Sequence, residues 1–187
     1  MRYKTFLAGA ALCAMTSCIG EVVNEYCNYQ CLFYFDGTMH AASPLAGSLN
    51  SPNSFVMVST APAAVGYDLI VGAYGGESHH EPITTEPETR PARVLGLNNA
   101  LVIGRSSLQD GDLYVFDRQC PNCYTESHTT KAPLSWTASG TQLHCKKCDR
   151  SYGLLNGGVV MSGENGEKLF RYRCTFFNNI FKIVNPL

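Results

Sequence analysis

Two cysteine pairs with the same spacing constrain the fold of this chain more than any other feature. Cys120 and Cys123 form the first C-x-x-C pair, and Cys145 and Cys148 form the second. A thiolate is a soft anionic ligand, and two such pairs on facing loops can complete the tetrahedron of Zn²⁺ or the four-cysteine shell of an iron site or iron–sulfur cluster. The spacing therefore predicts one metal centre on these four cysteines, and the chain must fold so that the two loops meet.

The composition favours one all-β domain around this site. The chain has 187 residues, of which 45% are hydrophobic, and this is enough for a single domain with a core. Glycine, tyrosine and phenylalanine are frequent and no long helical period is present, so we expect short antiparallel strands. The net charge of −1 provides no basic field for nucleic acid, which excludes nucleic-acid binding as the expected function.

The first residues have the pattern of an export signal. Arg2 and Lys4 precede an apolar run from Phe6 to Met15, which is too short to span a bilayer. Small residues then precede Cys18, a pattern that resembles the lipobox of bacterial lipoproteins. We therefore expect residues 1–17 to be a lipoprotein signal peptide and Cys18 to be acylated, which anchors the protein to a membrane facing the periplasm or the cell surface. An ordinary secretory signal cut near the same place is the alternative.

Residues 18–31 are predicted to form a tether, and they end in a further pair, Cys27 and Cys31. Disulfides persist outside the cytoplasm, so we expect a local disulfide that pins the start of a first strand at 32–35. A second thiol or metal site is the weaker alternative, because no third and fourth ligands follow. The single β-domain is then expected to cover residues 32–187.

Strand-like runs and turn residues place most of the remaining elements. Strands are expected at 54–59 and 67–74, whereas the proline-containing segment 75–91 is predicted to be a long exposed loop with a solvated pair, His79 and His80.

Hairpins are expected in the second half at the turn residues 98–99, 110–111 and 156–158. A strand at 113–117 runs into the first cysteine pair, so we expect a metal-binding subdomain of two C-x-x-C loops at about 117–158. Strands at 168–174 and 181–184 then complete the sheet.

The order of residues in the second half resembles a Rieske iron–sulfur domain. The stretches that carry the resemblance are LYVFDRQCPNC at 113–123, LHCKKCDRSYGLLNGGVV at 143–160 and KLFRYRC at 168–174. Five residues stand where the pattern of that family expects them: Asp117, Cys120, Cys145, Tyr152 and Gly158. The resemblance covers about the last half of the chain and implies a Rieske-like antiparallel β-barrel or sandwich.

The ligands depart from the Rieske pattern. The first loop reads C-x-x-C where that family has C-x-H, and Cys148 stands where the second histidine belongs. Two imidazoles give a Rieske centre its raised, pH-sensitive potential, and four thiolates remove both properties. A low-potential [2Fe-2S] cluster and a single Fe or Zn²⁺ ion remain open, with Zn²⁺ slightly favoured by the paired loops. The mature chain also resembles exported lipoproteins of Bacteroides-type bacteria with a Rieske-like fold and four cysteines.

Other residues near the loops are expected to serve the fold. His128 and His144 could replace a cysteine, but a surface or packing role is expected because four thiolates already complete a shell. Lys146 and Lys147 could offset the negative charge of the site or simply be exposed. Cys174 is expected to be a buried, unreactive thiol in a strand.

Two classes of function follow. The first is a lipid-anchored binding or structural module whose metal joins two loops and which presents a surface to an unknown envelope protein. The second is an electron carrier with iron on the same cysteines and a redox partner. A thiol oxidoreductase is a third alternative, disfavoured because its C-x-x-C needs a helix N-terminus that the sequence does not predict. A closed four-cysteine shell leaves no open position for hydrolysis.

Overall fold

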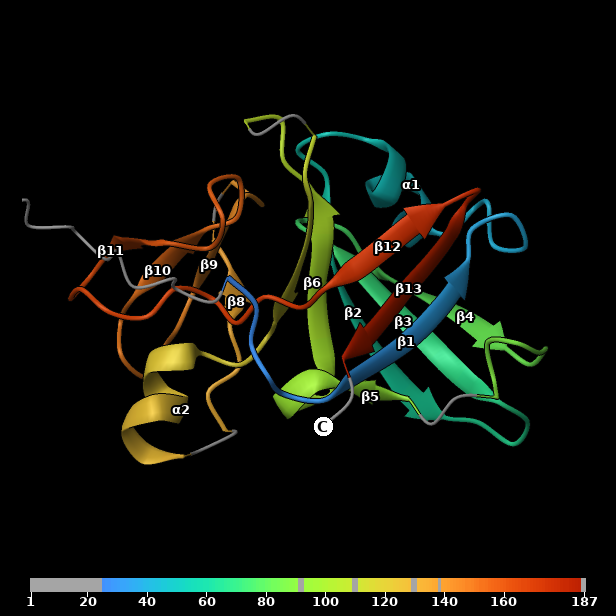
Figure 1. The fold of residues 1–187 in the computed structure, drawn as a ribbon, viewed down its shortest axis with the longest axis horizontal. Helices are drawn as coiled ribbons and strands as arrows, with labels where there is room; N and C mark the ends of the chain where they lie inside the picture. Colours follow the sequence, from blue (N-terminus) through green and yellow to red (C-terminus); the bar gives the residue numbers. More distant parts are fainter. Residues whose placement is uncertain (1–24, 91–92, 109–110, 129–130, 138, 186–187) are drawn as a thin grey trace, which may run out of the picture.

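The computed structural model describes residues 25–90, 93–108, 111–128, 131–137 and 139–185. Within these ranges the chain forms three antiparallel sheets, two short α-helices and one 3₁₀ turn (Figure 1). The predicted all-β class is therefore confirmed. None of the helices in the described part of the chain is long and apolar enough to cross a membrane.

A five-stranded sheet forms the centre of the molecule. Its order is β4-β3-β2-β6-β7, with β2 (Phe55–Pro62), β3 (Tyr67–Ala73), β4 (Ser78–Ile83), β6 (Ala100–Arg105) and β7 (Leu113–Asp117). The two strands predicted around 110–111 do form a hairpin, because β6 pairs with β7 from Leu101 opposite Asp117 to Arg105 opposite Leu113, while residues 109–110 of the connection lie outside the described ranges.

Both faces of this sheet are covered. Alternate residues of β6 belong to two separate cores: Leu101 and Ile103 pack in the first, and Val102 packs in the second. A strand that is buried on both faces has a continuous apolar run rather than an alternating one, as ALVI at 100–103 does.

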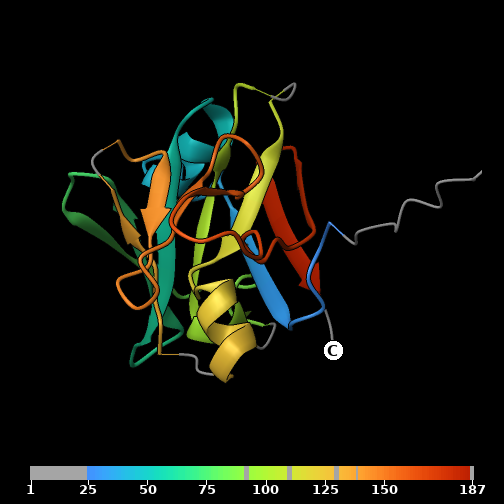
Figure 2. The ribbon, with the colours of Figure 1, turned by 90° about the vertical axis from the view of Figure 1, so that its left-hand side faces the viewer.

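A four-stranded sheet covers the first face. Its order is β12-β13-β1-β5, with β1 (Cys31–Asp36), β5 (Val94–Leu95), β12 (Cys174–Phe177) and β13 (Ile180–Asn185). Figure 2 shows blue β1 next to the red C-terminal strands. Cys31, Phe33 and Phe35 alternate inward into the first core, which helix α1 (Pro44–Asn50) covers with Leu45 and Leu49.

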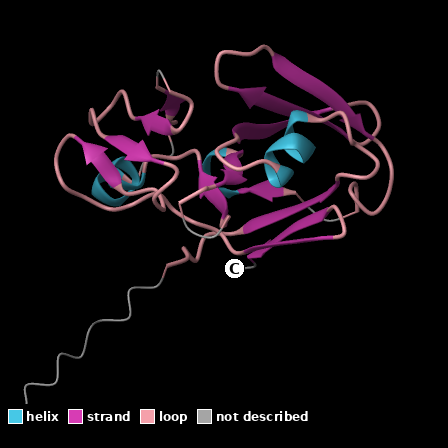
Figure 3. Cartoon of the chain, turned by 90° about the horizontal axis from the view of Figure 1, so that it is seen from above, coloured by secondary structure: helices cyan, strands magenta, loops and turns pink. Residues whose placement is uncertain are grey.

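A smaller body, on the left of Figure 3, covers the second face. It carries both cysteine pairs. It contains a third sheet of β8 (Ser135–Trp136), β9 (Gln142–His144), β10 (Ser151–Gly153) and β11 (Val160–Ser162), together with helix α2 (Pro121–Ser127). The predicted hairpin at 156–158 is present, since β10 pairs antiparallel with β11. The core of this body shares Phe55, Tyr114 and Phe116 with the central sheet.

Two predictions between residues 75 and 99 are wrong. The segment expected as a loop contains β4, which pairs with β3 and takes in His79 and His80. Pro82 is tolerated there because β4 is an edge strand of the sheet. No hairpin forms at 98–99, since β5 pairs with β1 and a 3₁₀ turn at Gly96–Asn98 leads away from it.

The strand expected at 168–174 is displaced. β12 begins only at Cys174, and the preceding residues instead contact β7 through single bonds, such as the Tyr172 N–H that donates to the Val115 carbonyl at 2.9 Å. This segment therefore links the outer sheet to the central sheet. The expected closing strand at 181–184 is present as β13.

Candidate metal centre

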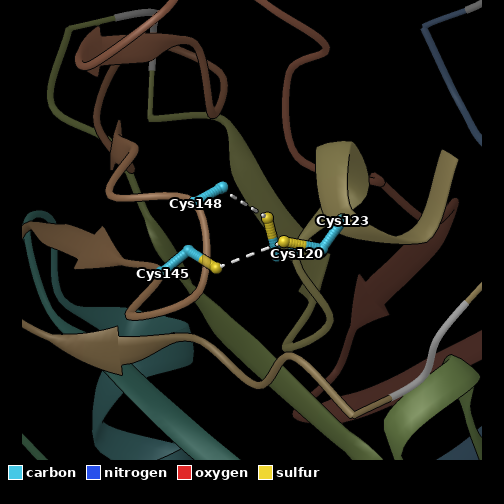
Figure 4. A group of neighbouring side chains, drawn as sticks. All are labelled: Cys120, Cys123, Cys145 and Cys148. Atoms are coloured by element: carbon cyan, nitrogen blue, oxygen red, sulfur yellow. Dashed lines mark hydrogen bonds between the residues drawn. The ribbon is translucent and has the colours of Figure 1, made fainter. Parts of the chain in front are cut away.

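The structure brings the four predicted cysteines together from two loops (Figure 4). Their sulfur atoms all lie within 4.8 Å of one another. Each short distance joins the two loops, with 3.6 Å between the Sγ atoms of Cys120 and Cys148 and 3.7 Å between those of Cys123 and Cys145. The first three of these residues along the chain are buried and Cys148 is half-buried.

These distances fit one tetrahedral ion. A metal bound at about 2.3 Å from each of four thiolates holds the sulfurs about 3.8 Å apart. The observed contacts of 3.6 and 3.7 Å are close to this value. The group is compatible with a metal site, and the donor set suits Zn²⁺ or iron.

Helix α2 positions the first pair. Cys120 is its N-cap residue and Pro121 occupies the first helical position, where its fixed φ is suited and its missing N–H is not needed. Cys123 therefore lies in the first turn, on the side of the second loop. The helix ends at His128, whose left-handed φ of 48° allows its N–H to donate to the Tyr124 carbonyl at 2.7 Å. No helix was expected here from the sequence, and Pro121 after a capping position is the signal that could have shown it.

A tight turn between β9 and β10 positions the second pair. The Cys145 N–H donates to the Arg150 carbonyl at 2.9 Å, and the Asp149 N–H donates to the Cys145 carbonyl at 2.9 Å. Asp149 has a left-handed φ of 59° that closes this turn. Lys146 and Lys147 are exposed at the tip of this turn, as one of the two alternatives for them expected.

A buried hydrogen-bond network reaches one sulfur. Asn122 Nδ2 donates to Tyr152 Oη at 2.8 Å, which leaves the tyrosine proton free to donate to Cys120 Sγ at 3.2 Å. Asn122 is itself fixed by the backbone of Glu167, to whose carbonyl it donates at 3.0 Å and from whose N–H it accepts at 2.9 Å. Tyr152 was expected near the site from the resemblance, whereas Asn122 was missed.

Arg150 places a buried positive charge beside the fourth sulfur. Its Nε donates to the Glu164 carbonyl at 3.0 Å, its Nη2 contacts the Glu164 carboxylate at 3.1 Å, and its Nη1 contacts Glu126 of α2 at 3.4 Å. Burial raises the pKa of Cys148, but the backbone N–H and the guanidinium of Arg150 outweigh burial and lower the pKa to about 7. Arg150 was not expected at the site from the sequence.

The thiols of the first pair behave differently. Burial raises the pKa of Cys120 to about 11, although Tyr152 opposes the shift, and burial raises the pKa of Cys123 as well. The position of the pair at the start of α2 therefore does not produce the lowered pKa that a thiol oxidoreductase uses. A metal ion must displace protons from these thiols in order to bind.

The histidines lie outside the sulfur group. His144 Nδ1 is 3.2 Å from Ser151 Oγ, and His128 is exposed at the end of α2. His79 and His80 lie on β4, where His80 Nδ1 is 2.7 Å from a carboxylate oxygen of Asp68. None of them belongs to the group that the four cysteines form.

The structure does not contain the predicted disulfide between Cys27 and Cys31, because both residues are free thiols. Cys31 is fully buried where β1 faces the first core. Cys27 lies in a segment that its own N–H fixes against the residues preceding β12, because this N–H donates to the Arg171 carbonyl at 2.9 Å. Burial raises the pKa of Cys27 to about 11.

Two further cysteines, Cys174 and Cys18, were also given roles from the sequence. Cys174 is half-buried rather than buried, and burial raises its pKa to about 11, which agrees with an unreactive thiol. Cys18, the expected lipidation site, lies outside the described residues.

Comparisons with known proteins found no match that assigns a function to this site. The chain matches no family model, and it matches no curated protein. The four sulfurs and the groups around them are therefore the basis for assigning a function.

Proposed function

We propose that this protein is a lipid-anchored cell-envelope module, binding or structural in role, whose Rieske-like β-domain carries one structural Zn²⁺ on Cys120, Cys123, Cys145 and Cys148. The observation that supports this most is the convergence of four sulfurs within 4.8 Å. Three of them are buried, and the shell they form leaves no position for substrate.

The proposed role of the ion is to join two elements that polar contacts such as Arg150–Glu126 also link. It connects the first turn of α2 to the turn between β9 and β10, and both cysteine pairs contribute to the second core. Zn²⁺ has no redox chemistry of its own, so it would remain stable outside the cytoplasm, where oxidants dismantle exposed clusters.

An electron carrier is the second candidate, and two observations favour it. Cys148 is half-buried, which would give a partner close access to the centre. Tyr152 directs a hydroxyl and Arg150 a guanidinium toward the sulfurs. Hydrogen-bond donors of this kind raise the reduction potential of an iron centre. A [2Fe-2S] cluster divides its four thiolates between two irons and thus separates them more than one ion does, so the compact sulfur group supports a single ion.

Metal analysis tests the proposal. Protein purified anaerobically from its native host should be colourless, with one Zn²⁺ per chain and no redox wave. Cys148→Ser should reduce the metal content, and Cys174→Ser, which changes a thiol outside the group, should not. Two irons with two sulfides per chain would reject the zinc proposal in favour of a cluster, and one iron with visible charge-transfer bands would favour the electron carrier.

Anchoring has its own test. Small residues before Cys18 support its acylation, whereas Leu12 stands before Cys13. Labelled fatty acid should enter the wild-type protein and the Cys13→Ala control but not Cys18→Ala. Label that persists in Cys18→Ala would contradict acylation of Cys18, and no label in any of the three proteins would leave an ordinary secretory signal.

A further inference from the structure

A polar pocket of about 230 Å³ lies where the end of β6 and the start of β7 meet β12. Its lining contains two guanidinium groups, two tyrosines, a cysteine and two apolar residues: Tyr26, Arg105, Leu113, Arg171, Tyr172, Cys174 and Phe176. None of these residues belongs to the four-sulfur group. The pocket is therefore a feature that the proposed metal centre does not explain.

Arg171 supplies a buried and fixed cation. Its side chain is only 10% exposed, and its guanidinium lies 4.4 Å from the centre of the Tyr114 ring and 5.1 Å from that of Tyr26. One amino group donates to the carboxylate of Glu25, but Nε is buried and has no hydrogen-bond partner among the described residues. Arg171 lines the pocket, so its guanidinium brings a buried positive charge next to any ligand there.

Arg105 is fixed on the other side of the pocket. Its Nε donates to the Leu49 carbonyl at 2.5 Å, and its Nη1 donates to the Gly111 carbonyl at 2.6 Å. The guanidinium lies 5.8 Å from the centre of the Phe176 ring. Backbone carbonyls hold this cation without neutralising it, so its charge remains available to the pocket.

The remaining groups do not offer a competing negative charge within the pocket. The hydroxyl of Tyr172 donates to Asp117 at 2.7 Å, and burial raises the pKa of Cys174, which keeps that thiol neutral. A third arginine, Arg173, adds positive charge nearby, because its guanidinium lies 4.8 Å from the centre of the Tyr26 ring. Glu25 neutralises only part of this charge.

We propose that this pocket binds a small oxyanion, a single phosphate or carboxylate group held between Arg105 and Arg171. A guanidinium presents parallel N–H donors that match these groups, and two preordered guanidiniums lose little side-chain freedom on binding. The pocket is too small for a larger ligand to enter completely, so a larger molecule would insert only its anionic group.

The first test uses the full-length wild-type protein with its metal. Amide resonances are followed by NMR while inorganic phosphate, acetate or chloride is added at constant ionic strength. Phosphate or acetate should cause saturable shifts at residues 105 and 172–176, and the tighter of the two anions identifies the preferred group. Shifts that do not saturate, or that chloride reproduces at equal concentration, would overturn the proposal.

Variants locate the binding. Arg171→Met removes the unpartnered donor and should weaken phosphate or acetate binding about tenfold or more, since bonds to charged groups are worth at least that factor. Arg90→Met is the control, because Arg90 is exposed and pairs with Glu86 away from the pocket. If Arg171→Met does not fold, Arg105→Lys is used instead. It keeps the positive charge but loses the parallel N–H donors of the guanidinium, so it should also weaken binding. Wild-type affinity in a folded variant of either arginine would refute the assignment.

Discussion

The imidazole of His40 lies between two carboxylates. Its Nδ1 is 2.6 Å from an oxygen of Glu81, its Nε2 is 2.9 Å from an oxygen of Glu88, and its ring stacks on Phe35. Glu88 is buried, and its other oxygen accepts the Asp36 N–H at 2.9 Å. Both ring nitrogens therefore face acceptors, and the doubly protonated, charged ring satisfies them.

The first prediction concerns this pair of contacts and pH. Burial lowers the pKa of His40, but Glu88 and Glu81 outweigh burial, so the folded pKa is raised above the ordinary value of 6.5. The stabilisation is therefore complete below about pH 6.5 and is lost as pH rises through the folded pKa. His40→Gln should lower the free energy of unfolding at pH 6 by about 1–3 kcal/mol and much less at pH 9.

Chemical denaturation at the two pH values measures this difference. His80→Gln is the control, because His80 also pairs with a carboxylate but its side chain is 58% exposed. An equal loss at both pH values for His40→Gln would show that the ring packs without bearing the charge.

The second prediction concerns Arg150 and the metal. Arg150→Met removes the buried cation beside Cys148, and the loss of such a supporting group lowers metal affinity by about 10–100-fold. Competition with a chromophoric chelator measures the affinity. Lys146→Met removes an exposed charge from the same loop and should change it far less; equal effects of the two variants would mean that only overall charge matters.

At the scale of elements, two glycines have opposite surroundings. A Cβ added at Gly104 in β6 would lie 2.2 Å from the Ser54 carbonyl oxygen and 2.6 Å from the Phe55 ring, whereas one added at Gly47 in α1 would meet nothing within 4 Å. The third prediction is that Gly104→Ala lowers the free energy of unfolding by about 1–3 kcal/mol. Gly47→Ala should raise it by about 0.5–1 kcal/mol. Thermal unfolding separates them, and matching signs would contradict the contacts at Gly104.

The elements that could be predicted were those with strong local signals. The apolar run of β6 and the turn residues after it led to the β6–β7 hairpin, and the spacing of the cysteines led to the metal group. Helix α2 was missed because it is one short helix whose stability comes from packing rather than from an amphipathic period. β4 was missed because its proline and its two histidines suggest a loop, and only its pairing with β3 makes it a strand.

Contacts between distant residues could not be predicted. Asn122 contacts Glu167, and Arg150 contacts Glu126, only because the fold brings their segments together. The sequence contains no local sign of these partners. The ligands were thus predictable, and the groups that surround them were not.

At the scale of the molecule, the two separate cores predict that two parts of the chain unfold with different free energies. The second core includes the four cysteines of the candidate metal centre, whereas the first core contains none of them. The fourth prediction is that removal of the metal with a chelator will loosen the body with α2 and β8–β11 while the first core remains folded. Hydrogen exchange should then increase in residues 121–162 and stay slow in β1 and β3. Uniform loss of protection would show that the two cores unfold together.

The pairing of β1 with β13 also determines when the outer sheet can be completed. Residues 55–117 contain all five strands of the central sheet, so that sheet can form early during synthesis. β1 is made before it but pairs with only two residues of β5 until residues 180–185 emerge from the ribosome. Phe33 and Phe35 lie beside Ile183 and Phe181 of β13 in the first core, so part of their cover comes only with that strand. A chain interrupted before residue 180 thus leaves β1 without its long partner strand and these two rings partly uncovered, which is the kind of transient surface that promotes aggregation.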